Sequence, residues 1–242
     1  MEVGVYGLGR FGYLWAEILS KKFTVKGFNR SGERKTPQGV IRVSEEELLH
    51  CDTIFLCVTI SSMEDVLKRI SVKIKEHTLV MDTCSVKVYP ARIMRDLLPE
   101  NVNIIGTHPM FGPDSVKHGL EHLPMVLSPV RAEEYQIEYW RGVFHDLGLK
   151  VLILTPEEHD REAAYTQGIT HFIGRVLEDL KLTESRIGTL GFKKILEVIE
   201  QTCNDPWQLF LDLQRYNPYT EEMRRNLNIS LQKIMDKLKT DA

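Results

Sequence analysis

Hydrophobic positions divide the chain into two parts with different periods. In residues 1–155, short apolar segments alternate with segments whose apolar residues recur at helical spacing. Strand-like segments include "TIFLCVTI" (53–60), "TLVMDTCS" (78–85) and "KVLILT" (150–155). Strands that are apolar on both faces and alternate with helices are typical of a parallel sheet covered on both sides. We therefore predict an α/β domain over residues 1–155.

The second part of the chain, residues 156–242, contains no strand-like segment. The stretches "EEHDREAAYTQGITHFIGRVLEDL" and "GFKKILEVIEQT", and the long run after them, all have a helical period. We place a domain boundary near residue 155 and predict a smaller, all-helical domain after it. So few helices cannot bury all of their apolar faces alone. Docking on the first domain or on a partner chain would cover them.

Composition and charge narrow the class of protein. The 242 residues carry a net charge of -3, with basic and acidic residues intermixed, which argues against a nucleic-acid partner. No apolar run approaches the length of a membrane span. The four cysteines are isolated, which argues against a disulfide framework or a zinc site and favours a reducing compartment. The chain enters a strand at once, so we expect no signal peptide and a cytoplasmic protein.

A glycine motif, "GLGRFG", follows the first predicted strand and opens a helix. Gly7 permits a tight turn, Gly9 lets the backbone approach a pyrophosphate, and Gly12 allows close packing of helix on strand. The helix N-terminus would present N–H groups to the phosphates. We therefore predict a Rossmann-type dinucleotide site made by these glycines and by the intervening residues Leu8, Arg10 and Phe11.

The end of the second predicted strand bears on the choice of cofactor. Domains that bind NAD place Asp or Glu there to hold the ribose hydroxyls, whereas this chain has Asn29, Arg30 and Ser31, with Arg34 following. Arginine pairs with a 2′-phosphate and serine adds a hydrogen bond, so we predict NADP rather than NAD. The alternative is that both arginines are solvated loop charges. Two further residues, Cys57 and Thr83, are also predicted to line the cofactor site.

A histidine with unusual neighbours ends the strand-like run of "IIGTHPMFGPDS". Pro109 and Pro113 follow it closely, so we expect His108 to stand in a stiff, non-regular turn. Ser85 and Lys87 follow another strand, which places all three residues on the same rim of the sheet, where ligands bind in open α/β folds. His108 could take a proton from a substrate hydroxyl while hydride leaves to the nicotinamide. A loop histidine in a structural turn is the alternative.

Four segments in order along the chain resemble the prephenate/arogenate dehydrogenase family. They are "DTCSVK", "GTHPMFGPDSVKHGL", "EEHDREAAYTQGITHFIGRVLEDL" and "GFKKILEVIEQTCNDPWQLF". The chain looks most similar to the plant-type arogenate enzymes that use NADP. This resemblance implies oxidation of a cyclohexadienol with loss of the ring carboxylate as carbon dioxide, and a homodimer formed through the helical domains.

The resemblance also implies roles for individual residues. His108 matches the family histidine that deprotonates the substrate hydroxyl, and Ser85 matches the serine beside it. Gln167, His171 and Thr189 match positions on the substrate side of the helical domain.

Asp205 matches a family position that faces the substrate side chain. A carboxylate there suits the ammonium group of arogenate and would repel the pyruvyl carboxylate of prephenate. Asp205 followed by Pro206 is equally well suited to begin a helix. An arginine that binds the ring carboxylate in many bacterial relatives is missing from "GFKKILE", and Lys193, Lys194 or Arg175 could replace it.

Three other histidines and two tryptophans are expected to have no part in binding or catalysis. His118, His122 and His159 lack the spacing of metal ligands and are expected to be surface or structural residues, so we predict no metal site. Trp140 and Trp207 lie at apolar helical positions and are expected in the core.

From these residues and the resemblance, we expect an NADP-dependent arogenate dehydrogenase of tyrosine biosynthesis. The alternatives are a prephenate dehydrogenase linked to NADP or NAD, another NADP-linked reductase with a helical domain, and a non-catalytic NADP-sensing protein on the same fold.

Overall fold

A computed structural model describes residues 1–240, except for the side chains of Lys117 and His118. The chain forms two compact units, the first spanning Met1–His159 and the second beginning at Asp160. The boundary therefore falls a few residues beyond the one that the sequence pattern predicts.

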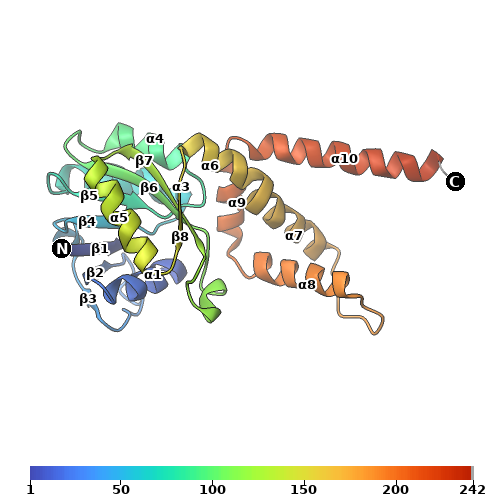
Figure 1. The fold of residues 1–242 in the computed structure, drawn as a ribbon, viewed down its shortest axis with the longest axis horizontal. Coiled ribbons are helices and arrows are strands. Elements are labelled where there is room, and N and C mark those ends of the chain that lie inside the picture. Colours follow the sequence, from blue (N-terminus) through green and yellow to red (C-terminus); the bar gives the residue numbers. More distant parts are fainter. Residues whose placement is uncertain (241–242) are drawn as a thin grey trace. The chain divides into compact units, whose positions relative to one another are not determined.

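The first unit is built on one eight-stranded sheet with the order β3-β2-β1-β4-β5-β6-β7-β8 (Figure 1). All neighbouring strands run parallel except β6 and β7, which are antiparallel. The strands are β1 (Glu2–Tyr6), β2 (Thr24–Phe28), β3 (Val40–Arg42), β4 (Thr53–Leu56), β5 (Leu79–Asp82), β6 (Asn103–Pro109), β7 (Pro124–Arg131) and β8 (Lys150–Ile153). This is the mostly parallel, Rossmann-type sheet that the sequence predicts. The short strand β3 was not among the predicted strands.

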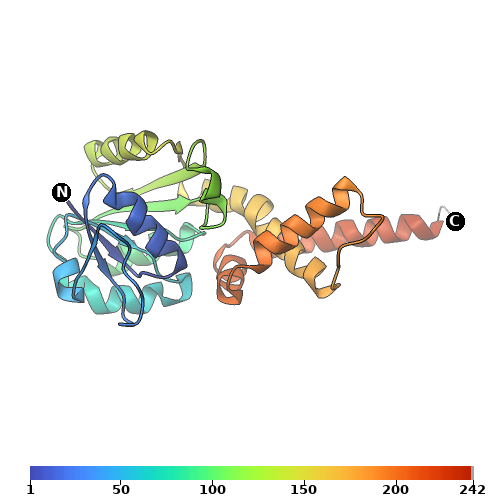
Figure 2. The ribbon, with the colours of Figure 1, turned by 90° about the horizontal axis from the view of Figure 1, so that it is seen from below.

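Helices cover both faces of this sheet (Figures 1 and 2). They are α1 (Arg10–Ser20), α2 (Glu45–Leu48), α3 (Ile60–Ile70), α4 (Val88–Leu97) and α5 (Glu134–Asp146). On one face, Trp15 of α1 packs edge-on against Phe55 of β4, with ring centroids 5.6 Å apart, and lies 5.8 Å from Phe144 of α5. Trp140 of α5 is buried in the same cluster, as the sequence predicts. The glycine motif and the segment around His108 are held by this core.

The second unit is entirely helical in its described residues, as the sequence predicts. Its elements are α6 (Pro156–Ala163), which begins in the first unit, a π-helical segment η3 (Ala164–Gly168), α7 (Ile169–Asp179), α8 (Leu190–Cys203), α9 (Trp207–Tyr216) and α10 (Thr220–Thr240). Helices α7 and α8 cross closely because Gly174 has no side chain. A Cβ atom at that position would lie 2.0 Å from Oγ1 of Thr202.

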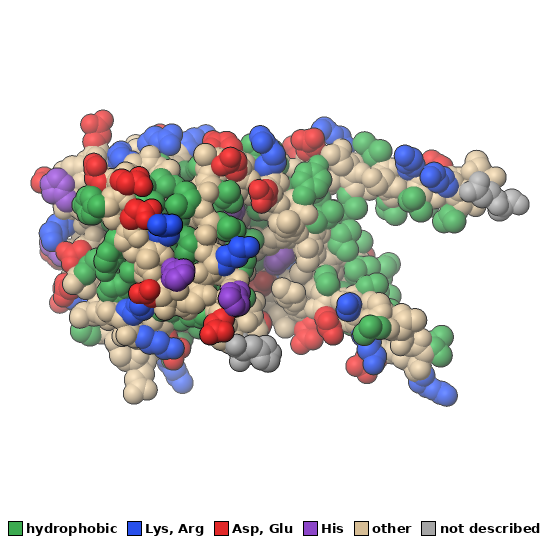
Figure 3. Space-filling view, viewed as in Figure 1, with side chains coloured by type: hydrophobic (Ala, Val, Ile, Leu, Met, Phe, Trp, Pro, Cys, Tyr) green, Lys and Arg blue, Asp and Glu red, His purple; other side chains and the backbone are tan. Residues whose placement is uncertain are grey.

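Apolar side chains gather on the surface of the helical unit (Figure 3). The C-terminal part of α10 is exposed over residues 228–240 and carries several of them. Trp207, which the sequence places in the core, is 56% exposed and stands at the first turn of α9. The helical period of its segment is correct, but Trp207 falls on the uncovered side of the helix. Within residues 1–240, no helix is both long and apolar enough to span a membrane.

Candidate active site

The glycine turn has the geometry that a pyrophosphate site needs. Gly7 adopts φ +102°, a conformation that residues with side chains rarely reach. A Cβ at Gly12 would lie 1.8 Å from the Gly7 carbonyl oxygen, so only glycine permits α1 to start this close to β1. No atom lies within 4 Å of a Cβ placed on Gly9, which precedes α1, and the first turn of α1 has no acidic residue. The open approach and the N-terminal N–H groups of α1 fit a bound phosphate group.

Three residues of the glycine motif have side chains that are engaged within the protein. Leu8 is buried in the core, so a cofactor would meet its backbone only. Phe11 is partly buried and stacks 6.0 Å from Trp15. Arg10 is exposed and forms an ion pair with Asp114, which follows the "HPMFGP" segment. The glycine helix is thus tied to the segment that follows His108.

The loop after β2 is joined to the glycine turn by Asn29. Its side-chain oxygen accepts a hydrogen bond from the Leu8 N–H at 3.0 Å, and its amide nitrogen donates to the Ser31 carbonyl at 3.1 Å. The side chains of Arg30, Ser31 and Arg34 are exposed. Asn29 therefore occupies the place where an NAD-type carboxylate would stand, and it is used to connect the two loops.

Cys57 and Thr83 follow the neighbouring strands β4 and β5. The Cys57 carbonyl lies directly against Gly7, since a Cβ at Gly7 would come within 2.4 Å of it. Burial raises the pKa of the Cys57 thiol to about 12, so it stays protonated at neutral pH. The hydroxyl of Thr83 donates to the Leu56 carbonyl at 3.3 Å. Both residues line the end of the sheet where the glycine turn lies.

His108 is part of a strand and does not stand in a turn, contrary to the sequence expectation. Strand β6 continues through Pro109, where His108 faces Val126 and Pro109 faces Met125 of the antiparallel strand β7. The N–H of Met110 then donates to the Pro124 carbonyl at 3.0 Å. Proline is tolerated at the end of a strand, where its missing N–H interrupts no central ladder bond. The pairing with β7 thus holds the backbone at His108 in a fixed position.

A second histidine, His159 of α6, holds His108 in place. Its Nε2 lies 2.8 Å from Nδ1 of His108, and the two rings meet edge-on with centroids 5.1 Å apart. His108 is 3% exposed and His159 is 2% exposed. The expectation that His159 is a surface or structural residue is therefore incomplete, because it contacts the candidate base directly. His122 is exposed, as expected, and the side chain of His118 lies outside the described residues.

A buried ion pair connects the strand before Ser85 to the strand of His108. Asp82 and Lys87 form this pair, and both side chains are completely buried. The Lys87 amine also donates to the Thr107 carbonyl at 2.5 Å, and the Thr107 N–H donates to Asp82 at 3.3 Å. Asp82 also accepts from the Cys84 N–H at 2.9 Å. These bonds fix the ends of β5 and β6 relative to each other.

Ser85 lies between these anchors, on the same rim as His108, as the sequence predicts. It is largely buried. His108 is oriented by His159 through Nδ1, so Ser85 is not needed for that task. Ser85 is therefore better suited to contact a ligand than to hold the imidazole.

The segment after His108 packs against the glycine helix. The ring of Phe111 lies 6.3 Å from the ring of Phe11 and 6.3 Å from that of Trp15. Together with the Arg10–Asp114 ion pair, these contacts join the candidate base and the nucleotide turn into one framework.

In the second unit, the predicted substrate residues Gln167 and His171 lie one turn apart along η3 and α7, with Arg175 a further turn on. Each has a buried polar atom that lacks a hydrogen-bond partner among the described residues: Oε1, Nδ1 and Nε, respectively. Burial lowers the pKa of His171, the carboxylate of Asp205 opposes this shift, and the Arg175 charge adds to it. The stripe is polar, desolvated and incompletely bonded, a condition that a bound polar ligand would relieve.

Arg175, Lys193 and Lys194 are the three basic residues that could bind the ring carboxylate, and Arg175 has the best-defined contacts. Its guanidinium donates to the carbonyls of Thr202 and Asp205, at 3.2 and 2.7 Å, and stacks 5.2 Å from the Trp207 ring. Lys193 and Lys194 lie on α8. Helix α9 begins at Trp207, so Pro206 precedes its first turn.

Thr189 is separated from the other predicted substrate residues within one chain. Its hydroxyl caps α8 by accepting from the Phe192 N–H at 3.2 Å. The 14 residues of α8, about 20 Å of helix, lie between Thr189 and Asp205. Thr189 therefore has a capping role here and does not join Gln167, His171 and Asp205 in the same chain.

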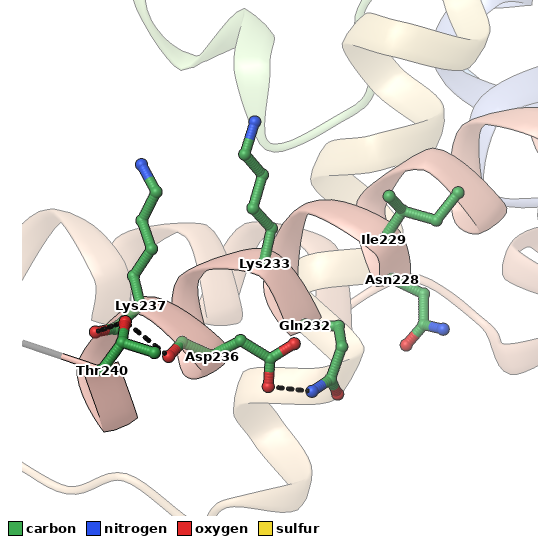
Figure 4. Close-up of a pocket in the computed structure, with 7 residues that line it drawn as sticks. All are labelled: Asn228, Ile229, Gln232, Lys233, Asp236, Lys237 and Thr240. Atoms are coloured by element: carbon green, nitrogen blue, oxygen red, sulfur yellow. Dashed lines mark hydrogen bonds between the residues drawn. The ribbon is translucent and has the colours of Figure 1, made fainter.

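A surface hollow elsewhere in the second unit does not form an enclosed site. A hollow along α10 is lined by residues of that helix alone, with Gln232 donating to Asp236 at 2.8 Å (Figure 4). Among the described side chains, no three His, Cys, Asp or Glu residues come together as metal ligands.

Residues 24–153 match the nucleotide-binding domain of prephenate dehydrogenase. The chain belongs to this family. Residues 176–242 match a TYRAAT1-like C-terminal domain. The chain is 32% identical to arogenate dehydrogenase 1 of Arabidopsis thaliana over 98% of its length, and 35% identical to arogenate dehydrogenase 2 over 78%. It spans 39% and 54% of the length of these two relatives.

The fold is that of the solved prephenate dehydrogenase of Aquifex aeolicus. That structure, a complex with hydroxyphenyl propionate and NAD+, has a TM-score of 0.75 and 19% identity, and the match covers 99% of this chain and 92% of the other. The likeness extends over both units of the chain.

Proposed function

We propose that the protein catalyses the oxidative decarboxylation of arogenate to tyrosine, with NADP as the hydride acceptor. The observation that carries this proposal is the buried His108, held through Nδ1 by His159 on the rim of the sheet where the glycine turn opens. The contact at Nδ1 fixes the orientation of the imidazole, and a fixed orientation suits a defined proton transfer at Nε2.

The chemistry requires a base, a hydride acceptor and a carboxylate that leaves. Bound NADP supplies the hydride acceptor. Nε2 of His108 takes the proton of the ring hydroxyl while hydride leaves the carbon that bears this hydroxyl, so that carbon becomes a carbonyl carbon. Nδ1–H of His108 donates to His159. The ring carboxylate leaves as carbon dioxide, and its electron pair completes the aromatic ring. Ser85 is proposed to hydrogen-bond the substrate hydroxyl.

NADP is favoured over NAD by the loop after β2. Its exposed side chains include Arg30, Ser31 and Arg34, and Asn29 replaces the carboxylate that would repel a 2′-phosphate. The Aquifex aeolicus structure contains NAD+, whereas a Saccharomyces cerevisiae relative is named prephenate dehydrogenase [NADP(+)], so relatives with either nucleotide occur. We take the loop after β2 as the feature that decides between them.

Arogenate is favoured over prephenate by Asp205. This carboxylate is close enough to His171 to affect its pKa, so it belongs to the polar stripe of the second unit. A negative charge would attract the arogenate ammonium and repel the second carboxylate of prephenate. Gln167 and His171 are the other proposed substrate residues of this unit, whereas Thr189 caps α8 away from them. Prephenate is the second candidate substrate, because the matched family is that of prephenate dehydrogenase.

A second copy of the chain is the proposed partner of the helical unit. Leu227, Leu231, Ile234 and Leu238 of α10 follow the spacing of a coiled-coil seam. Leu231 and Leu238 are 58% and 72% exposed. A homodimer would cover them, and sedimentation should show a dimer that Leu231→Glu dissociates.

The proposed location is the cytoplasm. All four cysteines are free thiols, which suits a reducing compartment. The two Arabidopsis relatives are named as chloroplastic, so imaging of a tagged chain in its own cells is the test.

The decisive experiment is a four-way assay of arogenate or prephenate with NADP or NAD. We expect the arogenate–NADP pair to give the highest kcat/KM. His108→Asn should lower kcat by about a hundredfold or more while NADP still binds. Full turnover by this variant, or no turnover of either substrate by the wild-type protein, would refute the proposal.

A further inference from the structure

One arginine outside the predicted cofactor residues holds the whole loop after β2. Arg42 ends strand β3, opposite Gly27 of β2. Its Nη2 donates to the carbonyls of Asn29 and Ser31 at 2.9 and 3.2 Å, and its Nη1 points to the Arg34 carbonyl at 3.4 Å. One guanidinium therefore fastens three points of a six-residue loop.

The backbone of β3 fixes Arg42 itself. The following residue, Val43, donates its N–H to the Gly27 carbonyl at 3.1 Å, which extends the pairing of β3 with β2 beyond Arg42. The side chain is thus fixed at its base by the sheet and at its tip by the loop. Short strand β3 accordingly serves as a support for the nucleotide loop.

The loop that Arg42 holds is the one that carries exposed positive charge. Arg30 and Arg34 outnumber Glu33 within it, and all three are exposed. Arg30 and Arg34 make no ion pair with a described residue, so their guanidinium groups are available to a dianionic ligand. Arg42 differs from them because both of its terminal nitrogens are already bonded to carbonyls.

Pre-ordering such a loop affects one part of the ligand in particular. Flexible arginines lose conformational entropy when they close on a phosphate, and a loop fixed beforehand loses less. The backbone groups at Gly9 and the start of α1 lie outside this loop, which is bonded to the glycine turn through Asn29 and the Leu8 N–H. Fixing the loop should therefore strengthen binding of a 2′-phosphate more than binding of the rest of the nucleotide.

We infer that Arg42 is a positioning residue that sets the preference for a 2′-phosphorylated nucleotide by holding the 29–34 loop in its binding conformation. The inference rests on the proposed use of NADP. It assigns discrimination to the shape of the Arg42 guanidinium fork, and charge alone is insufficient, since an ammonium cannot bridge three carbonyls in the same way.

Equilibrium binding of NADP, NAD and the fragment 2′,5′-ADP to the full chain tests the inference without reference to turnover. Arg42→Lys keeps the charge and loses the fork, whereas Arg42→Gln loses both. We expect Arg42→Lys to weaken NADP and 2′,5′-ADP binding about tenfold and NAD binding less than about twofold. Hydrogen exchange of the amides of residues 29–34 should become faster in the same variant.

Two controls define the outcome. Lys75→Gln removes a positive charge from an exposed ion pair with Asp52, far along the chain from the loop, and should leave both affinities unchanged. Arg34→Gln should weaken NADP binding without speeding exchange of the loop amides. An Arg42→Lys protein with the wild-type ratio of NADP to NAD affinity overturns the inference, as does an equal loss for both nucleotides. If the wild-type protein does not prefer NADP, the proposed cofactor fails first and the role of Arg42 with it.

Discussion

The rim of the first unit and the stripe of Gln167, His171 and Arg175 in the second differ in how completely their buried polar groups are bonded. On the rim of the first unit, Asp82 is bonded to Lys87, Cys84 and Thr107, and His108 is bonded to His159. In the second unit, buried polar atoms of Gln167, His171 and Arg175 lack described partners, while large apolar side chains are exposed. The rim is held by completed bonds, whereas the stripe has bonding capacity left that the proposed substrate would use.

The largest expected effect concerns the buried ion pair of Asp82 and Lys87 on the rim of the first unit. Lys87→Met should lower the free energy of unfolding of the first unit by about 3–5 kcal/mol, because Asp82 would remain as an unpaired buried charge. Chemical denaturation followed by tryptophan fluorescence in a Trp207→Phe background measures this, since the remaining tryptophans that the structure describes, Trp15 and Trp140, are buried in the first unit.

Lys68→Met is the matched control, because Lys68 pairs with Glu64 at 2.6 Å on the exposed surface. Its effect should be much smaller than that of Lys87→Met. Equal effects would show that the buried pair does not stabilise the rim.

The next effect tests whether His159 acts on His108. His159→Leu removes the acceptor for Nδ1–H and should lower kcat about a hundredfold, whereas His159→Gln supplies another acceptor and should retain kcat within about tenfold. The dissociation constant of NADP should stay unchanged in both variants. A purely structural role for His159 predicts equal losses in the two variants, accompanied by lower thermal stability.

The smallest effect concerns the second unit. Since burial lowers the pKa of His171 from 6.5, the folded protein binds this proton less well than the unfolded chain does. Stability should therefore fall as the pH drops below about 6.5, by at most about 1.4 kcal/mol per pH unit, until His171 is protonated in the folded state.

The difference in unfolding free energy between wild type and His171→Gln, measured at pH 7.5 and 5.5, isolates this contribution. The wild-type protein should lose more stability than the variant on acidification. Equal losses of stability in the two proteins would mean that the unbonded Nδ1 of His171 does not affect the free energy of unfolding. That result would weaken the contrast between the rim and the stripe.

Local spacing carried enough information to predict the nucleotide turn. Each glycine of "GLGRFG" has a steric reason that depends only on the strand before it and the helix after it, and the structure shows these reasons at Gly7 and Gly12. The alternation of apolar strands and helices likewise predicts the sheet and brings Ser85 and His108 to one rim. These are short-range patterns, and a single sequence records them.

Long-range pairings could not be predicted in the same way. His108 and His159 are 51 residues apart, and no spacing rule joins them. Strand β6 passes through Pro109 because β7 pairs with it, although proline chemistry alone suggests a turn. Arg42 belongs to a three-residue strand that is too short for a clear alternation. The exposure of Trp207 depends on which side of α9 is covered, which the helical period does not determine.

In the π-helical segment Ala164–Gly168, the number of residues matters as well as their identity. Such a segment holds one more residue than an α-helical turn would. Loss of a single residue there would restore a regular helix and rotate all that follows by about 100°. Asn217 would then leave the Asp160 carbonyl, and Tyr219 would leave the guanidinium of Arg161, because these contacts join residues on opposite sides of the segment. This stretch should accept many substitutions and reject one deletion.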